Sequence, residues 1–230
     1  LRAFIGGSMI LVTIGLLDDL HEVSPSIRFV AQIFAAALMA TWGGVILNDF
    51  GLLVSDSFVV TLGWLALRVT VFATVGVINA LNMVDGVNGL AGSVSLVAVA
   101  SMIIIAAESG DALATHWLGI VAVVLFAFLL FNWRFGATPA RSFMGDSGSM
   151  LIGFALAWSL IKLSQGEHRA MAPVTALWLF AVPLIDTLTM MVRRIRKRQS
   201  PFTADCEHFH HLLQCAGVGK FQTTIAITFM

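Results

Sequence analysis

The chain has 230 residues, of which 58% are hydrophobic and only 11% are charged. Soluble domains contain about a quarter charged residues, so this composition excludes an ordinary soluble protein. Acidic and basic residues balance at 13 each, but in a membrane protein the distribution of charge matters more than its sum. We expect no nucleic-acid partner. Apolar runs of roughly 20 residues, enough to span a bilayer as a helix, recur along the chain. We predict an all-α, polytopic helical integral membrane protein with one membrane-embedded domain over residues 1–230.

Seven complete spans and part of an eighth can be placed in chain order. The predicted spans are Ala3–Leu17, Phe29–Leu47, Leu65–Met83, Leu90–Ala107, Trp117–Phe131, Met150–Leu163 and Ala172–Val192, with an eighth beginning near Thr223. The chain starts at Leu1 and stops within an apolar run, so we expect a fragment that lacks spans at both ends. Cys206 and Cys215 form no CxxC pair and imply no disulfide framework.

The basic residues predict the orientation of these spans. If the loop after the first span is cytoplasmic, nine basic residues lie inside and four outside, as the positive-inside rule expects. The inner residues are Arg28, Arg134, Arg141, Arg193, Arg194, Arg196, Lys197, Arg198 and Lys220, and the outer ones are Arg2, Arg68, Lys162 and Arg169. Five polar segments then fall on the cytoplasmic side, and carboxylates near membrane depth usually mark a functional path. We therefore predict a single site at the cytoplasmic boundary.

The first of these segments, "LLDDLHEVSP", places Asp18 and Asp19 where the first span leaves the membrane. Adjacent carboxylates repel each other unless a cation lies between them. Mg²⁺, held by oxygen ligands and a substrate phosphate, is one such cation. A helix-end cap followed by a solvated turn explains the pair equally well.

The second segment, "NALNMVDGVNGL", carries a polar residue at every third position. The four are Asn79, Asn82, Asp85 and Asn88. On a continuing helix this spacing puts neighbouring members on one side, and Gly86 and Gly89 permit close backbone approach or a break in the helix. Polar contacts between packed helices explain one or two such amides. Four polar residues beside two glycines favour one wall of a cytoplasmic cleft that holds a metal ion and a ligand.

The third segment, "FMGDSGSML", precedes the sixth span. Ser147 or Ser149 is a candidate cap for that helix. The positive end of the helix also favours an anionic ligand there. The alternative for Asp146 is an acidic residue that merely stabilises the helix N-terminus.

The remaining segments surround the end of the seventh span. The basic run Arg193–Arg198 is either part of the site or a stop signal on anionic lipid headgroups. On a helix His208 and His211 share a face, whereas an extended chain pairs His208 with His210. Neither geometry brings all three histidines to one zinc ion, so phosphate or sugar contacts and proton transfer suit them better. Asp186, which follows Pro183, is expected only to support the site. The alternative is a buried acid paired with an arginine or with a backbone amide of a broken helix.

Clustered acids, amides, arginines and histidines without a hydrolytic triad fit metal-assisted chemistry on a phosphate. At a membrane boundary such a site can join a water-soluble phosphate donor to a lipid acceptor. A transporter is the alternative from another class, but transporters bind near the midplane and often show repeated halves. An inactive membrane scaffold is a third alternative.

Four ordered motifs, "LDDLHEVSP", "NALNMVDGVNGL", "FMGDSGS" and "SPFTADCEHFHHLL", resemble those of the polyprenyl-phosphate N-acetylhexosamine-1-phosphate transferases. The resemblance covers nearly the whole chain. It implies transfer of a sugar-1-phosphate from a UDP-N-acetylhexosamine to undecaprenyl phosphate, with release of UMP, in the cytoplasmic leaflet of the bacterial inner membrane. It also implies Mg²⁺, with Mn²⁺ as a second candidate. The sequence leaves the oligomeric state open, and a homodimer is compatible with it.

The resemblance also implies roles for individual residues. Asp18 and Asp19 are expected to be catalytic, together with His210 and His211 of the His-x-His-His motif, which lies near the pyrophosphate with His208. Asn82 and Asp146 are the expected metal ligands. The other expected substrate contacts are Arg28 near phosphate, Asn132 near the nucleotide, Phe143 stacked on uracil, and Arg193 and Arg194 in a sugar-recognition loop. The predicted cleft wall, rather than the resemblance, adds Asp85 as a catalytic residue and Asn79 and Asn88 as nucleotide contacts.

Two positions depart from the family pattern. Asn88 stands where bacterial relatives usually have a second aspartate, which puts an acid or base role there in doubt, and Glu22 replaces the third acid after the aspartate pair. The transferase for phospho-MurNAc-pentapeptide is the rival within the family. Its histidines follow Ser-Pro almost directly, whereas six residues separate Pro201 from His208 here. This spacing favours the GlcNAc-1-phosphate branch.

Overall fold

The computed structural model describes residues 1–52, 58–133, 140–167, 169–197 and 208–229. These parts are helical, apart from loops and a single isolated β-bridge, which confirms the predicted all-α class. The helices are α1 (Arg2–His21), α2 (Pro25–Thr41), the 3₁₀ turn η1 (Gly63–Leu65), α3 (Ala66–Val84), α4 (Leu90–Glu108), α5 (Ala112–Asn132), α6 (Gly145–Ser164), α7 (Pro173–Leu179), α8 (Ala181–Arg196), α9 (Phe209–Cys215) and α10 (Lys220–Thr228).

Within the described residues, five helices are long and apolar enough to cross a membrane, and the bent pair α7–α8 gives a sixth if it counts as one span. The second predicted span is shorter than expected. Its helix, α2, has 17 residues and ends at Thr41 rather than Leu47. Gly43 and Gly44 follow, and Gly44 has a φ of 65°, a backbone conformation that commonly ends a helix.

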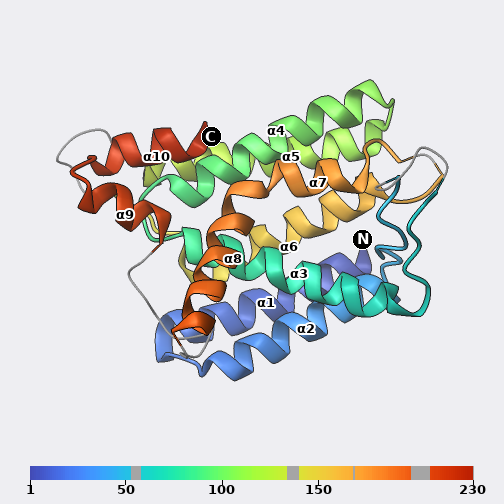
Figure 1. Cartoon of the computed structure of the whole chain (residues 1–230), viewed down its shortest axis with the longest axis horizontal. Helices are drawn as coiled ribbons and strands as arrows, with labels where there is room; N and C mark the ends of the chain where they lie inside the picture. The colour runs from blue at the N-terminus through green and yellow to red at the C-terminus, as the bar shows by residue number, and fades with distance from the viewer. Residues whose placement is uncertain (53–57, 134–139, 168, 198–207, 230) are drawn as a thin grey trace.

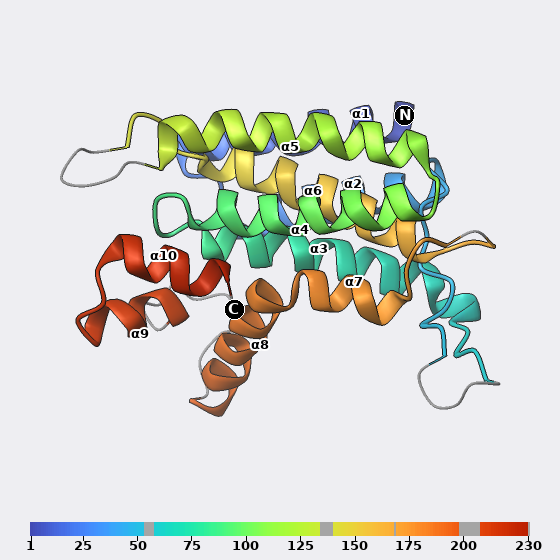
Figure 2. The same ribbon diagram turned by 90° about the horizontal axis from the view of Figure 1, so that it is seen from above.

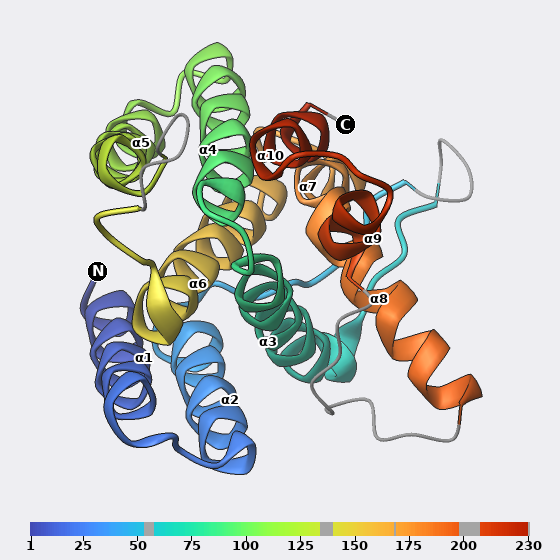
Figure 3. The ribbon, with the colours of Figure 1, turned by 90° about the vertical axis from the view of Figure 1, so that its left-hand side faces the viewer.

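Helix α6 lies at the centre of the bundle, with α1, α2, α3, α4 and α5 arranged around it (Figure 3). Two of its contacts are so close that only glycine fits. A Cβ on Gly153 of α6 would lie 2.8 Å from Cα of Ile78 on α3, and a Cβ on Gly15 of α1 would lie 2.4 Å from Cα of Ser147 on α6. Small residues let membrane helices approach at backbone distance. The first turn of α6 is therefore fixed closely against α1.

The predicted seventh span, Ala172–Val192, is wrong as a single helix. It is broken at Phe180 into α7 and α8, whose axes differ by 80°. The reason is Pro183, whose ring would collide with the carbonyl of Leu179 if the helix continued, while proline is tolerated in the first turn of α8. Helix α8 consequently leaves the bundle and projects from its side (Figure 2).

The helix ends that carry the polar motifs lie together at one end of the bundle. Helices α1 and α3 end there, α2, α4 and α6 begin there, and α9 lies beside them at the left of Figure 1. Helix α10 begins at Lys220, close to the predicted start near Thr223. Its Thr224 hydroxyl donates to the backbone oxygen of Asn88, and Ile227 packs with Val84 and Leu90. Helices α9 and α10 therefore cover the loop that joins α3 to α4.

Candidate functional site

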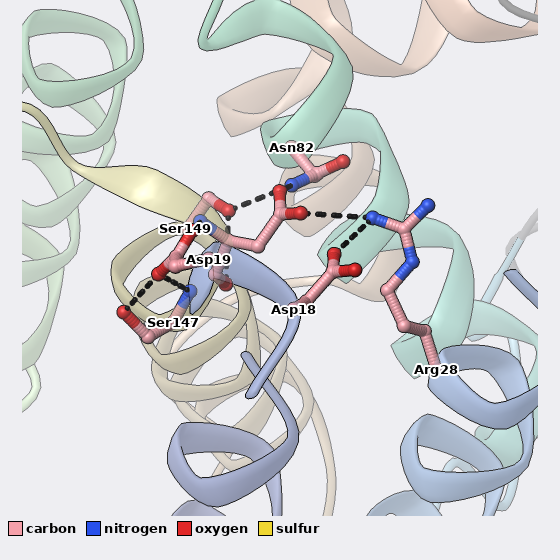
Figure 4. A network of polar contacts seen from close by, with 7 residues as sticks. Asp18, Asp19, Arg28, Asn82, Ser147 and Ser149 are labelled. Carbon is pink, nitrogen blue, oxygen red and sulfur yellow. Dashed lines mark hydrogen bonds and ion pairs between the residues drawn. The ribbon is translucent and has the colours of Figure 1, made fainter. Parts of the chain in front are cut away.

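Arg28 joins two of the predicted site carboxylates (Figure 4). It lies in the first turn of α2, and its Nη1 is 2.6 Å from Asp18 Oδ2 and 2.8 Å from Asp146 Oδ2. The Asp18 side chain is only 7% exposed, whereas those of Arg28 and Asp146 are 28% and 29% exposed. A guanidinium in this position offsets the repulsion between carboxylates that come from two different helices. Arg28 thus lies between Asp18 and Asp146 and not between the adjacent Asp18 and Asp19, so a metal ion beside the aspartate pair stays a prediction.

Asp19 points the other way and caps α6. Its Oδ1 accepts the backbone N–H of Asp146 at 2.8 Å, and its Oδ2 accepts the Ser147 hydroxyl at 2.9 Å. We expected Ser147 or Ser149 to cap this helix and an anionic ligand to lie at its positive end. The structure instead places the Asp19 carboxylate there, because Gly15 brings α1 close enough for it to reach. Gly145, with a φ of 66°, adopts the left-handed conformation that starts the turn beside Asp19.

Asn82 connects α3 to the same turn of α6. Its Nδ2 donates to Asp146 Oδ1 and, at 2.9 Å, to the Ser149 hydroxyl. Asp146 therefore accepts a hydrogen bond from Asn82 on Oδ1 and one from Arg28 on Oδ2. The two predicted metal ligands are brought together, and Ser149 is a buried partner that was predicted only as a cap.

The groups around Asp146 are carboxylates, the Asn82 amide and a hydroxyl, whose oxygen atoms are ligands that Mg²⁺ prefers, although in this structure Asn82 turns its Nδ2 toward Asp146. Among the described residues no three His, Cys, Asp or Glu side chains form a ready-made metal cluster. A Mg²⁺ ion at Asp146 would therefore be completed by amide oxygen, water or substrate phosphate, as is usual for this ion. The residues present fit the ion.

Asp85 follows the last residue of α3 and faces this cluster. Burial, and then the negative charges of Asp146 and Asp19, raise the pKa of Asp85 to about 7. A carboxyl group with a pKa near the working pH is suited to exchanging a proton. The helical spacing of the motif ends here, because the chain turns through residues 85–89 into α4, and Asn88 lies exposed on that loop.

The histidine motif packs on the same loop. A Cβ on Gly86 would lie 2.7 Å from Nε2 of His210, so only glycine admits the ring at this distance. The rings of His208 and His210 are parallel, at 4° and 5.6 Å between centroids, and His211 lies 4.2 Å from His210. His208 is extended and α9 begins at Phe209. The structure therefore shows the pairing expected for an extended chain, with His211 beside it.

Burial and the neighbouring imidazoles lower the pKa of His210 to about 4. His210 is therefore neutral at pH 7. Its ring packs on Gly86, so the histidine motif lies next to the loop that carries Asp85.

Two residues that were predicted to contact the nucleotide have hydrogen-bond partners within the protein. Asn79 donates through Nδ2 to Gln32 Oε1 at 2.6 Å, which joins α3 to α2. This is the contact between packed helices that was the alternative for such amides. Asn132 is the last residue of α5. It is buried, its Oδ1 accepts the Gly89 N–H, and its Nδ2 donates to the Ser142 carbonyl.

The remaining predicted substrate contacts lie around the site. Phe143 is 74% exposed just before α6, as a side chain that stacks on a base requires. Arg193 lines a cavity with His210, whereas Arg194 is buried. Arg134, Arg198 and the "SPFTADCE" part of the fourth motif lie outside the described residues. Gln32 was not singled out in the sequence, although a lone amide inside an apolar span is a signal for a buried polar contact.

The chain is similar to characterised bacterial proteins. The model of glycosyl transferase family 4 matches residues 1–164. Proteins named undecaprenyl-phosphate alpha-N-acetylglucosaminyl 1-phosphate transferase are 37% identical over 219 residues in Escherichia coli K12, 37% over 227 in Yersinia pestis and 41% over 222 in Haemophilus influenzae. These matches cover 95%, 99% and 96% of this chain.

The chain spans 59% of the Escherichia coli relative and 62% of the other two. The family match includes Asp18, Asn82 and Asp146, which the structure brings to one end of the bundle. The four motifs, the helical bundle and the match over residues 1–164 agree with one another, and the chain belongs to glycosyl transferase family 4.

Proposed function

We propose that the protein containing this chain transfers N-acetylglucosamine-1-phosphate from UDP-N-acetylglucosamine to undecaprenyl phosphate. In this reaction an oxygen of the lipid phosphate forms a bond to the β-phosphorus of the donor. The bond between that phosphorus and the oxygen bridging to the α-phosphate breaks, and UMP leaves. The observation that carries the proposal is the meeting of Asp18, Arg28, Asn82 and Asp146 at one end of an apolar bundle.

The position of this cluster suits a reaction between a soluble and a lipid substrate. Helices with exposed apolar side chains reach the same end of the bundle as the carboxylates. A polyprenyl phosphate can keep its chain in the bilayer there while its phosphate meets a nucleotide from the water phase. We place this end on the cytoplasmic side of the bacterial inner membrane, because the positive-inside rule assigns nine of the 13 basic residues to it.

Asp146 and Asn82 are the residues that would hold Mg²⁺, with Mn²⁺ as a substitute. When bound, such an ion neutralises phosphate oxygens and orients the pyrophosphate. For the ion to bind, Asp146 must release Arg28, the Asn82 amide or both. We infer that Arg28 then turns to a substrate phosphate, for which a guanidinium has the right charge and geometry.

The other residues have distinct roles in this proposal. Asp19 holds the N-terminal turn of α6, and with it Asp146, in place. The buried carboxylate of Asp18 holds the guanidinium of Arg28 in place. Burial and the charges of Asp146 and Asp19 raise the pKa of Asp85 to about 7 in the metal-free protein, and release of this proton would be favoured when a cation is bound at Asp146. Phe143 is free to stack on the uracil, and the histidines face the pyrophosphate.

The test uses membranes from cells that express the complete protein. They are supplied with undecaprenyl phosphate, Mg²⁺ and sugar-labelled UDP-N-acetylglucosamine, and label in the lipid phase is measured alongside released UMP. We expect labelling that requires the metal and is lost in Asp146→Asn. UDP-N-acetylgalactosamine and UDP-MurNAc-pentapeptide serve as competing donors.

Asp111→Asn is the matched control. Asp111 caps the N-terminus of α5 at the opposite end of the bundle, and asparagine caps a helix as well as aspartate does. This variant should retain the activity of the unmodified protein. Labelling that is equal in Asp146→Asn and Asp111→Asn would refute the assignment of the site, and faster labelling from UDP-MurNAc-pentapeptide would refute the assignment of the donor.

A further inference from the structure

A cavity of about 310 Å³ lies beside the histidines and contains a carboxylate that has no role in the cluster around Asp146. Its lining comes from α8, α9 and α10 and from the ends of α3 and α4, and most of it is apolar. Asp186, Thr189 and Arg193 line it from one face of α8, and His210 lines it from α9. The break at Phe180 brings Asp186 to this position, because a straight seventh span would not turn α8 across the end of α3.

Both oxygens of Asp186 are engaged by the start of α9. Oδ2 lies 3.0 Å from Nδ1 of His208, and Oδ1 accepts the backbone N–H of Phe209 at 2.9 Å. The side chains of Asp186 and His208 are each 10% exposed. The Phe209 N–H belongs to the first turn of α9, where backbone donors lack partners within the helix. One carboxylate therefore fixes both the backbone and the first ring of the histidine motif.

The hydrogen bond to Asp186 sets the proton position on His208. A carboxylate only accepts hydrogen bonds, so Nδ1 must carry a proton, and in the neutral ring Nε2 is then the acceptor. Carboxylates that hold histidines in this way fix both the tautomer and the ring orientation. Without Asp186 the ring is free to rotate and to exchange tautomers.

The orientation of His208 is passed on to the other two rings. His208 stacks in parallel on His210, and His210 packs on Gly86 and lies 4.2 Å from His211. No donor or acceptor in the described parts of the chain reaches Nε2 of His210, which is buried. A shift of His208 would therefore move a ring that packs directly on the Asp85 loop.

We propose that Asp186 is a positioning residue for the transfer reaction, which acts through His208 by holding its Nδ1–H tautomer and seating the three histidine rings against the loop of Gly86. The inference rests on the proposed function for its activity readout. Asp186 need not touch the substrate in this account, and its removal acts on the histidines.

The first measurement is a double-mutant cycle in the complete protein, with activity normalised to folded enzyme. Asp186→Asn keeps an acceptor for the Phe209 N–H but loses the charge that selects the tautomer. We expect kcat to fall about 10- to 100-fold, the loss that follows when the carboxylate orienting a metal-bound histidine is removed. In a His208→Ala background the same change should have almost no further effect, because its target is gone. Losses that multiply in the double variant would overturn the proposal.

The second measurement does not depend on activity. In protein labelled with ¹⁵N-histidine, the ring nitrogens of His208 are assigned by comparison with His208→Gln. We expect the Nδ1–H tautomer in the unmodified protein and its loss in Asp186→Asn, while Asp111→Asn leaves the spectrum unchanged. An unaltered tautomer in Asp186→Asn would refute the inference. Asp186→Glu, which keeps the charge, is the second variant if Asp186→Asn does not fold.

The two failures are distinguishable. If the unmodified protein transfers no sugar phosphate, the proposed function fails and the NMR measurement still decides the tautomer. If transfer occurs and Asp186→Asn matches the unmodified protein, the function stands and the role of Asp186 is wrong.

Discussion

A substitution at Gly15, where α1 contacts Ser147 of α6, should disturb the site without changing a residue in it. A methyl group at Gly15 would lie 2.4 Å from Cα and 2.6 Å from N of Ser147, and both are backbone atoms. Ordinary contacts begin at 3.4 Å, so in Gly15→Ala helices α1 and α6 must separate by about 1 Å. Gly6→Ala on the same helix is the control, because its new methyl group meets only the Trp42 ring at 3.7 Å.

This separation reaches the site through Asp19, one turn further along α1. The bond from the Asp146 N–H to Asp19 measures 2.8 Å, and lengthening it by about 1 Å removes it as a hydrogen bond. Overpacking costs about 1–3 kcal/mol, loss of the hydrogen bond to Asp19 costs about 1.5–3 kcal/mol, and replacing glycine in a helix by alanine returns up to about 1 kcal/mol. We expect Gly15→Ala to be destabilised by about 2–5 kcal/mol and Gly6→Ala to be slightly stabilised.

The assay combines thermal unfolding in detergent with the transfer reaction. A hydrogen bond to a charged group contributes about 1.5–3 kcal/mol, so transfer by folded Gly15→Ala should fall roughly 10- to 100-fold if the bond acts on the reacting state. Gly6→Ala should match the unmodified protein. If Gly15→Ala folds with unchanged stability and full activity, the close packing of α1 on α6 is not what holds Asp146 in place.

Three further predictions concern single side chains. Arg28→Met should lower the free energy of unfolding by about 1.5–3 kcal/mol, since Asp18 is left buried without its partner. Arg28→Lys should recover part of this loss, as measured by thermal unfolding. Equal stability of the unmodified protein and the two variants would contradict the ion pair. Because the folded chain keeps a proton on Asp85 that the unfolded chain has released, the free energy of unfolding should fall by up to about 4 kcal/mol between the ordinary pKa of 3.8 and the raised pKa of about 7. In metal-free buffer the pH series for Asp85→Asn should lack this decline, and parallel curves for the two proteins would exclude the raised pKa. Gln32→Leu should lower the free energy of unfolding by about 1–3 kcal/mol, because Asn79 loses its acceptor inside the bundle. Gln32→Glu keeps an acceptor and so separates loss of the acceptor from loss of volume. An unchanged unfolding midpoint in Gln32→Leu would show that the contact contributes nothing to stability.

The sequence predicts which residues meet, because membrane topology restricts them to one end of the bundle. Asp18, Asn82 and Asp146 lie on three different helices, yet alternation of the spans puts them at the same boundary. The sequence cannot predict that Asp18 pairs with Arg28 whereas Asp19 caps α6. That division depends on the distance between α1 and α6, which a single methyl group at Gly15 would change.

The amides show the same limit. Asn79 and Asn82 belong to one motif with one spacing, but Asn79 faces Gln32 on α2 and Asn82 faces Asp146 on α6. Only the packing of neighbouring helices separates a structural amide from one in the site. The seventh span is predicted without a break although it contains Pro183. The direction of α8, and hence the contact of Asp186 with His208, comes from tertiary packing.

The most direct test of the central claim follows the phosphorus atom that changes partners. Membranes with the complete protein receive undecaprenyl phosphate, Mg²⁺ and UDP-N-acetylglucosamine labelled with ³²P at the β-phosphate. Sugar-phosphate transfer predicts that the label enters the lipid phase together with the sugar and that unlabelled UMP appears in equal amount. Label that stays in the water phase as UDP while the sugar enters the lipid would contradict the account, because the sugar alone would then have been transferred.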